Sequence, residues 1–272
     1  MLNINTNILS LTTQTNLTGS QSALSQAINR LSSGKRINTA ADDAAGLAIA
    51  TSQTAAINAL TQGVANANNG ISMIQTANGA LQSTIDNLQR IRTLAVQSGD
   101  GSLDSSARSN LQSEVTTRLG EIDRVASQTS FNSQSILGGI STVSFQIGAA
   151  ASQTVSVDFG STTWNSSGMS LTGLSVSSQS SAQSAITAID AALKQVNTFQ
   201  ATLGAAQNTF QAAISTTQTQ ATNMSAARAQ ITDANFATET ANLSKAQVLQ
   251  QAGISVLAQA NSLPQQVLKL LG

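Results

Sequence analysis

The side chains that usually carry out enzyme chemistry are scarce in this sequence. Its 272 residues include no His, Cys or Tyr, so it offers no imidazole base, no thiol nucleophile and no usual zinc, haem or iron–sulfur ligand set. Two carboxylate pairs remain, Asp42/Asp43 and Glu121/Asp123. Helix capping explains the first pair, and a solvated helix face shared with nearby arginines explains the second. We therefore expect a protein that is not an enzyme and that holds no cofactor or metal.

The arginines Arg90 and Arg92 admit two interpretations. Asp86 lies four residues before Arg90, which is the spacing of an ion pair along the exposed face of one helix. In the second interpretation, the arginines belong to a recognition patch that also contains Leu94 and Glu114. Composition alone favours the solvated face over a patch that binds a partner.

Low charge narrows the class of protein. Charged residues make up 9% of the chain, against about 25% in typical soluble proteins. The net charge of zero gives no sign of a nucleic-acid partner, and no apolar run approaches the ~20 residues that a membrane span needs. Neutral amides and hydroxyls lose their water at a lower cost than Lys or Glu does. We therefore expect a folded subunit whose surfaces meet neighbouring subunits.

The chain also suggests a route of export. Its first residues lack the basic and apolar regions of a cleaved signal peptide, and the absence of Cys fits life outside the cell without disulfides. An exported protein of this kind would use a route other than general secretion.

The charged residues described above lie in or beside segments that the sequence predicts to be long helices. Apolar residues recur at alternating steps of three and four from Leu60 to Ala95 and again from Ile186 to Met224, the heptad pattern of helices packed on helices. The run Thr39-Ala40-Ala41-Asp42 has the form of a capping box and predicts the start of the first long helix. A further helix is expected from about Asp104 to Thr129. The fold class is therefore mostly α, an elongated rod of long heptad helices.

A short β region interrupts the helices. The apolar period changes to two within residues 143–147 and 155–159, which predicts a β-hairpin over about 143–159. Residues 160–180, rich in Ser, Gly and Thr, are expected to form a surface loop or cap before the last rod helix.

The two ends of the chain carry matching heptads. Each is too short and too weakly amphipathic to be stable alone, so we expect them to pair as a coiled coil. This predicts a discontinuous terminal domain, 1–42 with 229–272, and a helical rod domain, 43–228. The heptad positions are Leu17, Leu24 and Leu31 at the head, and Phe236, Leu243 and Leu257 at the tail.

Several stretches resemble the signatures of bacterial flagellins. The resemblance covers about residues 1–160 and 185–272, with the motifs in the family's order. In the first half they are Leu31–Asn38 followed by Asp42–Gly46, Leu88–Ser98 and Glu121–Val125; near the end they are Ser244–Gly253 and Val256–Asn261.

The resemblance implies a structural subunit that self-assembles into the bacterial flagellar filament for motility. It implies export of the unfolded chain through the flagellar type III apparatus to an extracellular filament. The implied partners are further copies of the chain, an export chaperone, the filament cap and the hook-junction proteins, with no nucleic acid and no membrane insertion. Residues 160–180 stand where longer flagellins carry outer domains, so the sequence looks like a short form. A hook–filament junction protein of the same export class is the alternative.

The resemblance also gives the recognition patch a partner. In flagellins that Toll-like receptor 5 detects, an Arg, a Leu and a Glu on the rod form the main contact. The matching positions are Arg90, Leu94 and Glu114, and all three have the family's residue type. The implied patch is an apolar anchor, Leu94, flanked by two charges.

Overall fold

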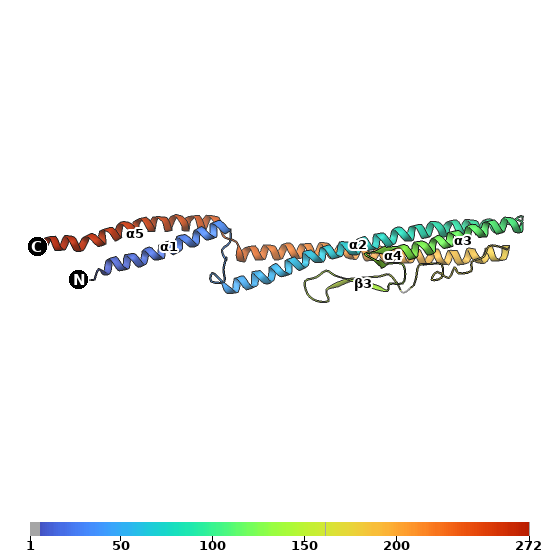
Figure 1. Ribbon diagram of the computed structural model, residues 1–272, viewed down its shortest axis with the longest axis horizontal. Coiled ribbons are helices and arrows are strands. Elements are labelled where there is room, and N and C mark those ends of the chain that lie inside the picture. The colour runs from blue at the N-terminus through green and yellow to red at the C-terminus, as the bar shows by residue number, and fades with distance from the viewer. Residues whose placement is uncertain (1–5, 161, 272) are drawn as a thin grey trace. The chain divides into compact units, whose positions relative to one another are not determined.

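The computed structural model describes residues 6–160 and 162–271, and this part of the chain is mostly α-helical, as predicted (Figure 1). The helices are α1 (Ile8–Ser33), α2 (Ala44–Ser98), α3 (Ser105–Gln128), α4 (Gln179–Thr232) and α5 (Phe236–Leu271). Four strands lie between α3 and α4: β1 (Ser130–Phe131), β2 (Gln134–Ser135), β3 (Thr142–Gln146) and β4 (Thr154–Asp158). No helix in the described ranges is long and apolar enough to cross a membrane.

The chain divides into two compact units. Unit 1 comprises Met1–Ala55 and Asn223–Gly272, and unit 2 comprises Ala56–Thr222. The division falls within α2 and α4, because the first residues of α2 and the last residues of α4 associate with the chain ends. The domain boundaries predicted from the sequence fall between residues 42 and 43 and between residues 228 and 229, and both positions lie inside unit 1. The division into a terminal domain and a rod domain stays a prediction.

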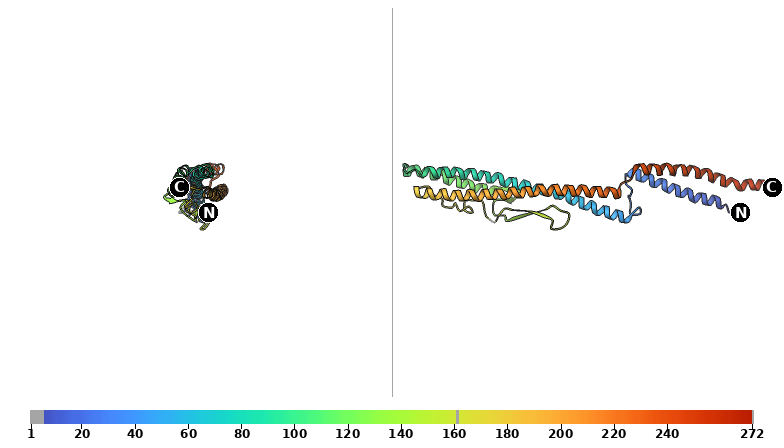
Figure 2. Two further views of the ribbon diagram at one scale, coloured as in Figure 1. Left: turned by 90° about the vertical axis from the view of Figure 1, so that its right-hand side faces the viewer. Right: turned by 180° about the vertical axis from the view of Figure 1, so that it is seen from behind.

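In unit 1, α1 and α5 lie side by side in opposite directions (Figures 1 and 2). At one end the Asn7 side-chain amide donates to the Ala260 carbonyl over 2.7 Å. At the other end Arg30 and Glu239 form an ion pair of 3.1 Å. The predicted pairing of head and tail is confirmed. α5 continues as one helix through Gly253 and Pro264.

The linkers that leave α1 and enter α5 also pair. Gly34 ends α1 with a φ of 69°, a left-handed conformation that Gly adopts without strain. The Arg36 amide donates to the Thr232 carbonyl at 2.7 Å, and the Ala234 amide donates to the Gly34 carbonyl at 3.0 Å. These two bonds tie the chain before α2 to the chain after α4.

The start of α2 differs from the predicted capping box. The Asp43 carboxylate accepts from the Gly46 amide at 2.8 Å, so Asp43 caps the helix. Asp42 instead closes the preceding turn by accepting from the amides of Asn38 and Thr39 at 3.1 and 2.9 Å. The correction is physical: the first free N–H groups of α2 come after residue 43, out of reach of Thr39.

Unit 2 is built on α2, α3 and α4, which run side by side in Figures 1 and 2. The predicted seam of α2 is buried at seven positions: Leu60, Ala67, Ile74, Leu81, Ile85, Leu88 and Ala95. Further residues of α2 are also buried, namely Met73, Ala77, Ile91 and Leu94. The buried face is wider than one heptad seam because α2 packs against more than one neighbour.

The predicted hairpin is present. β3 and β4 pair antiparallel, with Val143 opposite Val157 and Phe145 opposite Val155. One face of the hairpin packs on the helices: Val157 is fully buried, and the ring of Phe145 meets Phe210 of α4 edge to face, with centroids 5.5 Å apart. The opposite face carries exposed polar side chains.

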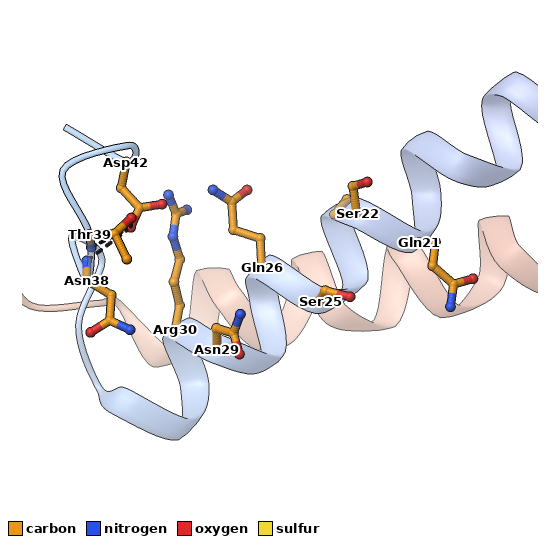
Figure 3. A pocket seen from close by; sticks show the side chains of 10 residues that line it. Gln21, Ser22, Ser25, Gln26, Asn29, Arg30, Asn38, Thr39 and Asp42 are labelled. Carbon is orange, nitrogen blue, oxygen red and sulfur yellow. Dashed lines mark hydrogen bonds between the residues drawn. The ribbon is translucent and has the colours of Figure 1, made fainter.

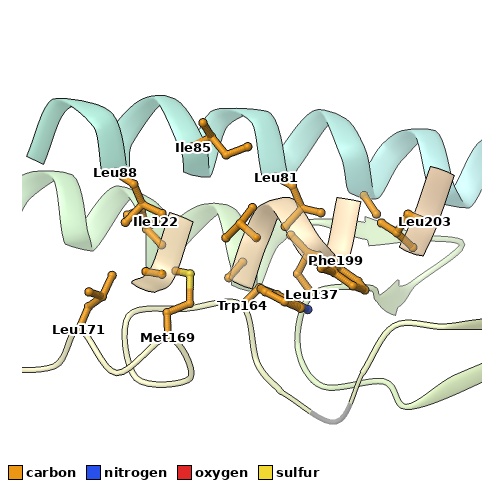
Figure 4. Close-up of a cluster of buried hydrophobic side chains, with 14 of the residues drawn as sticks. Leu81, Ile85, Leu88, Ile122, Leu137, Trp164, Met169, Leu171, Phe199 and Leu203 are labelled. Atoms are coloured by element: carbon orange, nitrogen blue, oxygen red, sulfur yellow. The ribbon is translucent and has the colours of Figure 1, made fainter. Parts of the chain in front are cut away.

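Residues 162–178, named here the strap, are more deeply packed than the predicted surface loop. Their apolar side chains Trp164, Met169 and Leu171 are buried (Figure 4). Val176 is buried as well. The Trp164 indole stacks on Phe199 of α4 with centroids 4.2 Å apart. The Ser, Gly and Thr residues of this segment predict a surface loop, but its spaced large apolar side chains belong to the core of the helices, because burial removes their apolar surface from water.

Candidate assembly and recognition surfaces

The seam between α1 and α5 is made of large side chains alternating with small ones. The predicted positions Leu17, Leu24, Leu31, Leu243 and Leu257 are half-buried. The buried positions are smaller or polar: Thr13, Ala27, Glu239, Ala246 and Ala260. Small residues let the two helix backbones approach, and the leucines close over them.

Phe236 does not belong to this seam. Its side chain is 59% exposed, although the heptad spacing predicts contact with α1. Phe236 is the first residue of α5, and the antiparallel offset places it opposite Gly34, where α1 has already ended. The predicted partner surface is therefore missing at that position.

Exposed apolar surface is concentrated in unit 1. Among the described side chains, ten of the eleven large hydrophobic residues that are exposed lie there, and Val96 is the exception in unit 2. The ten are Ile8, Leu9, Leu11, Ile28, Ile49, Phe236, Val248, Leu249, Ile254 and Val256. Covering apolar surface contributes about 25 cal/mol per Å² removed from water. The surface of unit 1 is therefore suited to contact with other protein surfaces.

Two hollows on unit 1 are lined by both polar and apolar groups. The first, of about 680 Å³, lies beside the end of α1 and the turn before α2, and Figure 3 shows Gln26, Arg30 and Asp42 around it. The second, of about 610 Å³, lies between α1 and α5 and includes Lys245 and Leu249. Amides and hydroxyls dominate the lining of the first hollow, and the second combines them with charged and small apolar residues. Such groups can form hydrogen bonds with a neighbouring polypeptide.

In unit 2, Arg90 of α2 and Glu114 of α3 form a two-pronged ion pair. The Nε–Oε1 distance is 2.8 Å and the Nη2–Oε2 distance is 3.1 Å. The hydrogen bond from Arg90 lowers the pKa of Glu114. Arg90 therefore does not pair with Asp86 along its own helix, which was one of the two interpretations, and Asp86 accepts from the Gln82 side-chain amide at 3.0 Å. The pair leaves both side chains partly exposed, at 48% and 34%.

Leu94 does not form the exposed anchor that the sequence predicts. Its exposed fraction is 1%, and it belongs to the core of unit 2. Arg90 lies one turn earlier, and its long side chain reaches outward from the edge of the buried face while Leu94 points inward. The structure therefore brings Arg90 and Glu114 together at the surface and places Leu94 in the core.

A second ion pair on α2 was not predicted. Arg92 contacts Asp190 of α4, with an Nε–Oδ1 distance of 2.6 Å, and this hydrogen bond lowers the pKa of Asp190. Arg90 and Arg92 thus connect α2 to different neighbours, α3 and α4. No local signal reveals Asp190, since it lies 98 residues from Arg92 in the sequence.

The second carboxylate pair, Glu121/Asp123, is split between two roles. Glu121 pairs with Arg124 on the exposed face of α3, as predicted. Asp123 instead accepts from the Ser166 amide at 2.7 Å and from its hydroxyl at 2.9 Å, which anchors the strap. Glu121 also lines a hollow of about 730 Å³ with Asp86, Glu114 and Arg118. In the described part of the chain, no three His, Cys, Asp or Glu residues gather as metal ligands would.

Comparison with known proteins identifies what this architecture resembles. Residues 4–142 match the model of the bacterial flagellin N-terminal helical region, and residues 186–271 match that of the bacterial flagellin C-terminal helical region. A flagellin of Xenorhabdus nematophila is 42% identical over 98% of this chain and 98% of its own length. A flagellin of Salmonella muenchen is 55% identical over 57% of this chain, which is only 31% of that longer protein.

Solved structures agree on the fold. The crystal structure of Bacillus cereus flagellin superposes with a TM-score of 0.51 at 26% identity, over 60% of this chain and 94% of that one. A putative flagellar hook-associated protein from Vibrio parahaemolyticus superposes with a TM-score of 0.60 over 71% of this chain, at 13% identity. At that identity the likeness concerns the fold alone and gives no support to the hook-junction alternative.

Proposed function

This chain belongs to the bacterial flagellin family and is a structural subunit of the flagellar filament, not an enzyme; from this premise we propose how it assembles, how it leaves the cell and which other proteins it contacts. Flagellins self-assemble into filaments, so the first partner is a further copy of the chain.

The paired ends in unit 1 are the proposed assembly element. The observation that carries this proposal is the concentration of exposed large apolar residues on α1 and α5. A monomer that exposes such a surface gains free energy when neighbouring subunits cover it. Unit 2 has its own core of buried apolar residues, so it does not need the chain ends to fold.

Deletion tests this division of roles. Chains lacking 1–36 or 229–272 should remain helical monomers and should fail to polymerise on filament seeds, because each deletion removes one partner of the α1–α5 pair. Seeded polymerisation followed by sedimentation and electron microscopy is the measurement. Filaments formed by either truncated chain would refute the proposed role.

A point substitution tests the role of the exposed apolar surface in assembly more specifically than a deletion does. Val248 is 64% exposed, so Val248→Asp should leave the helical content of the monomer unchanged while preventing polymerisation. Gln247→Asp is the matched control, because it adds the same charge to an exposed neighbour without removing apolar surface. Equal loss of assembly in both variants would show that added charge, not lost apolar contact, is responsible.

Export of the unfolded chain through the flagellar type III apparatus to an extracellular filament is the proposed route. The chain has no Cys to cross-link it during passage, and the weak amphipathicity of α1 and α5 favours their separation before assembly. The proposed accessory partners are an export chaperone, the filament cap and the hook-junction proteins. In cells whose flagellar export is disabled, the chain should be absent from the culture medium.

Toll-like receptor 5 is the proposed host partner, with Arg90 and Glu114 as the surface contacts. The corrected position of Leu94 changes its role: it supports the α2 backbone under Arg90 from within the core, and it does not touch the receptor. The partly exposed ion pair and the adjoining polar hollow supply the charged surface. Such charges mainly determine orientation and association rate.

A further inference from the structure

Arg30 of α1 and Glu239 of α5 form an ion pair inside the terminal helix pair. The Nη1–Oε1 distance is 3.1 Å, and the two side chains are 24% and 9% exposed. The second carboxylate oxygen of Glu239 accepts from the Asn242 side chain at 3.4 Å. Of the ion pairs recorded among the described residues, this is the only one that links α1 to α5.

The apolar seam around this pair repeats itself and therefore discriminates poorly between registers. In α1 the leucines alternate with small residues, and in α5 Leu243 and Leu257 alternate with Ala and Gly, while the half-buried Gln250 is the polar position between them. Large and small residues interdigitate: a Cβ added to Gly253 would lie 3.3 Å from Leu17 Cδ1. The repeating positions are Thr13, Leu17, Ser20, Leu24, Ala27 and Leu31 in α1, and Leu243, Ala246, Gly253, Leu257 and Ala260 in α5. A slip of seven residues would place most large residues against similar partners again.

The ion pair does not repeat in this way. A slip of seven residues in one direction would move Glu239 to Ala23, and the opposite slip would move Arg30 to Ala246. Either slip leaves both charges without their counter-charge, and an unpaired charge inside a helix interface is strongly unfavourable. We propose that the Arg30–Glu239 pair specifies the heptad register in which the two ends of the chain associate.

The consequence for the filament rests on the proposed role of the chain ends in assembly. Only one register presents the exposed apolar residues of α1 and α5 in the arrangement that a neighbouring subunit accepts. A slipped pair would bury nearly the same apolar area within the subunit and would still fail to assemble. The Arg30–Glu239 pair thus favours subunits in the register that can assemble over subunits in a slipped register.

Besides side-chain hydrogen bonds such as that from Asn7 to Ala260, the backbone bridge between the linkers also depends on the register. The bonds from Arg36 to Thr232 and from Ala234 to Gly34 lie close to the ion pair and involve main-chain atoms only. Substitution of Arg30 or Glu239 leaves those main-chain groups unchanged. If the bridge alone sets the register, removal of the ion pair will not shift it.

Cysteine cross-linking can report the register, because the natural chain contains no Cys. Gln21 and Gln250 are hydrogen-bonded at 3.0 Å, so Gln21→Cys with Gln250→Cys reports the observed register. Gln14→Cys or Ile28→Cys with Gln250→Cys reports a slip of one heptad in either direction, and residues 14 and 28 are exposed like Gln21. Each cysteine pair is introduced into four versions of the full chain: without a charge reversal, with Arg30→Glu, with Glu239→Arg, and with both reversals. The cysteines are then oxidised under assembly conditions in the presence of filament seeds.

With Arg30 and Glu239 present, the 21–250 cross-link should predominate. Each single charge reversal should slow that cross-link at least about tenfold, and the 14–250 or 28–250 product should appear. The double reversal should restore the 21–250 cross-link, since it re-forms the pair with opposite polarity. A single reversal that leaves the 21–250 rate unchanged, a double reversal that fails to restore it, or a parent chain that forms no 21–250 cross-link would overturn the inference. Seeded polymerisation of the chain without substitutions tests the filament role separately.

Discussion

Gly63 of α2 lies directly against the carbonyl of Ile147, where β3 ends and the hairpin turns back. A Cβ placed on Gly63 would overlap that carbonyl oxygen, far inside any allowed contact. Backbone faces backbone here, so no side-chain rotation can relieve the overlap. The hairpin can lie this close to α2 only because residue 63 has no side chain.

Gly63→Ala should therefore lower the free energy of unfolding by about 1–3 kcal/mol, the usual cost of forcing an extra carbon into a packed site. The matched control is Gly79→Ala on the same helix, where an added Cβ meets nothing within 4 Å. That control should raise stability by about 0.5–1 kcal/mol, because Ala has the higher helix propensity. Urea denaturation of both variants measures the two changes in the free energy of unfolding. If Gly63→Ala stabilised the protein as Gly79→Ala does, the close approach of the hairpin to α2 would be contradicted.

Ile85 tests the phase of α2. Its side chain is 7% exposed within the core of unit 2, so Ile85→Ala should cost about 2–5 kcal/mol. Gln82→Ala on the exposed face should change stability by no more than about 0.5 kcal/mol. Thermal melts of the two variants provide the comparison. Similar changes in both would mean that the buried face of α2 is assigned incorrectly.

Ser133 occupies a position suited to Gly. The loop between β1 and β2 is Asn132-Ser133, with φ values of 48° and 66°. Two-residue hairpin loops with positive φ at both positions favour Asn-Gly, so Ser133→Gly should stabilise unit 2 by about 0.5–1 kcal/mol. Ser127→Gly, inside α3, should instead lower the stability of unit 2. A loss of stability for Ser133→Gly would argue against this turn.

Acid should open the turn before α2. The amides of Thr39 and Asn38 lower the pKa of Asp42 below its ordinary value near 3.8. A carboxylate whose pKa is lowered by folding stabilises the folded state at pH values above its pKa in the unfolded chain. This contribution is lost as the pH falls through its pKa in the folded state. The Thr39 amide resonance should therefore titrate below pH 3.8. Asp42→Asn should abolish that titration, and a midpoint at or above the ordinary value would exclude the predicted cause.

The receptor proposal distinguishes Arg90 from Leu94. Arg90→Ala should weaken receptor binding by at least about 1–2 kcal/mol without changing the melting temperature of the monomer beyond a few degrees. Leu94→Ala should lower stability by about 2–5 kcal/mol, because Leu94 is a core residue. Binding assays and melts on the same preparations measure both effects. A Leu94 variant with unchanged stability and weakened binding would restore Leu94 as a direct contact.

The sequence alone determined the elements whose patterns are local. A repeat of three and four residues is set by helix geometry and a repeat of two by strand geometry, so α2, α3, α4 and the β3–β4 hairpin could be predicted without knowing their neighbours. The matching heptads at the ends likewise predicted the pairing of α1 with α5. The family motifs then supplied the filament role.

Only the tertiary structure decided which side of each element is covered. Leu94 is buried because α2 has several neighbours, and a heptad seam describes contact with one. Phe236 is exposed because α1 ends before reaching it. Asp190 and Glu114 became the partners of Arg92 and Arg90 because helices distant in the sequence lie beside α2. Burial and ion pairing depend on distances through space, and a linear pattern records only distances along the chain.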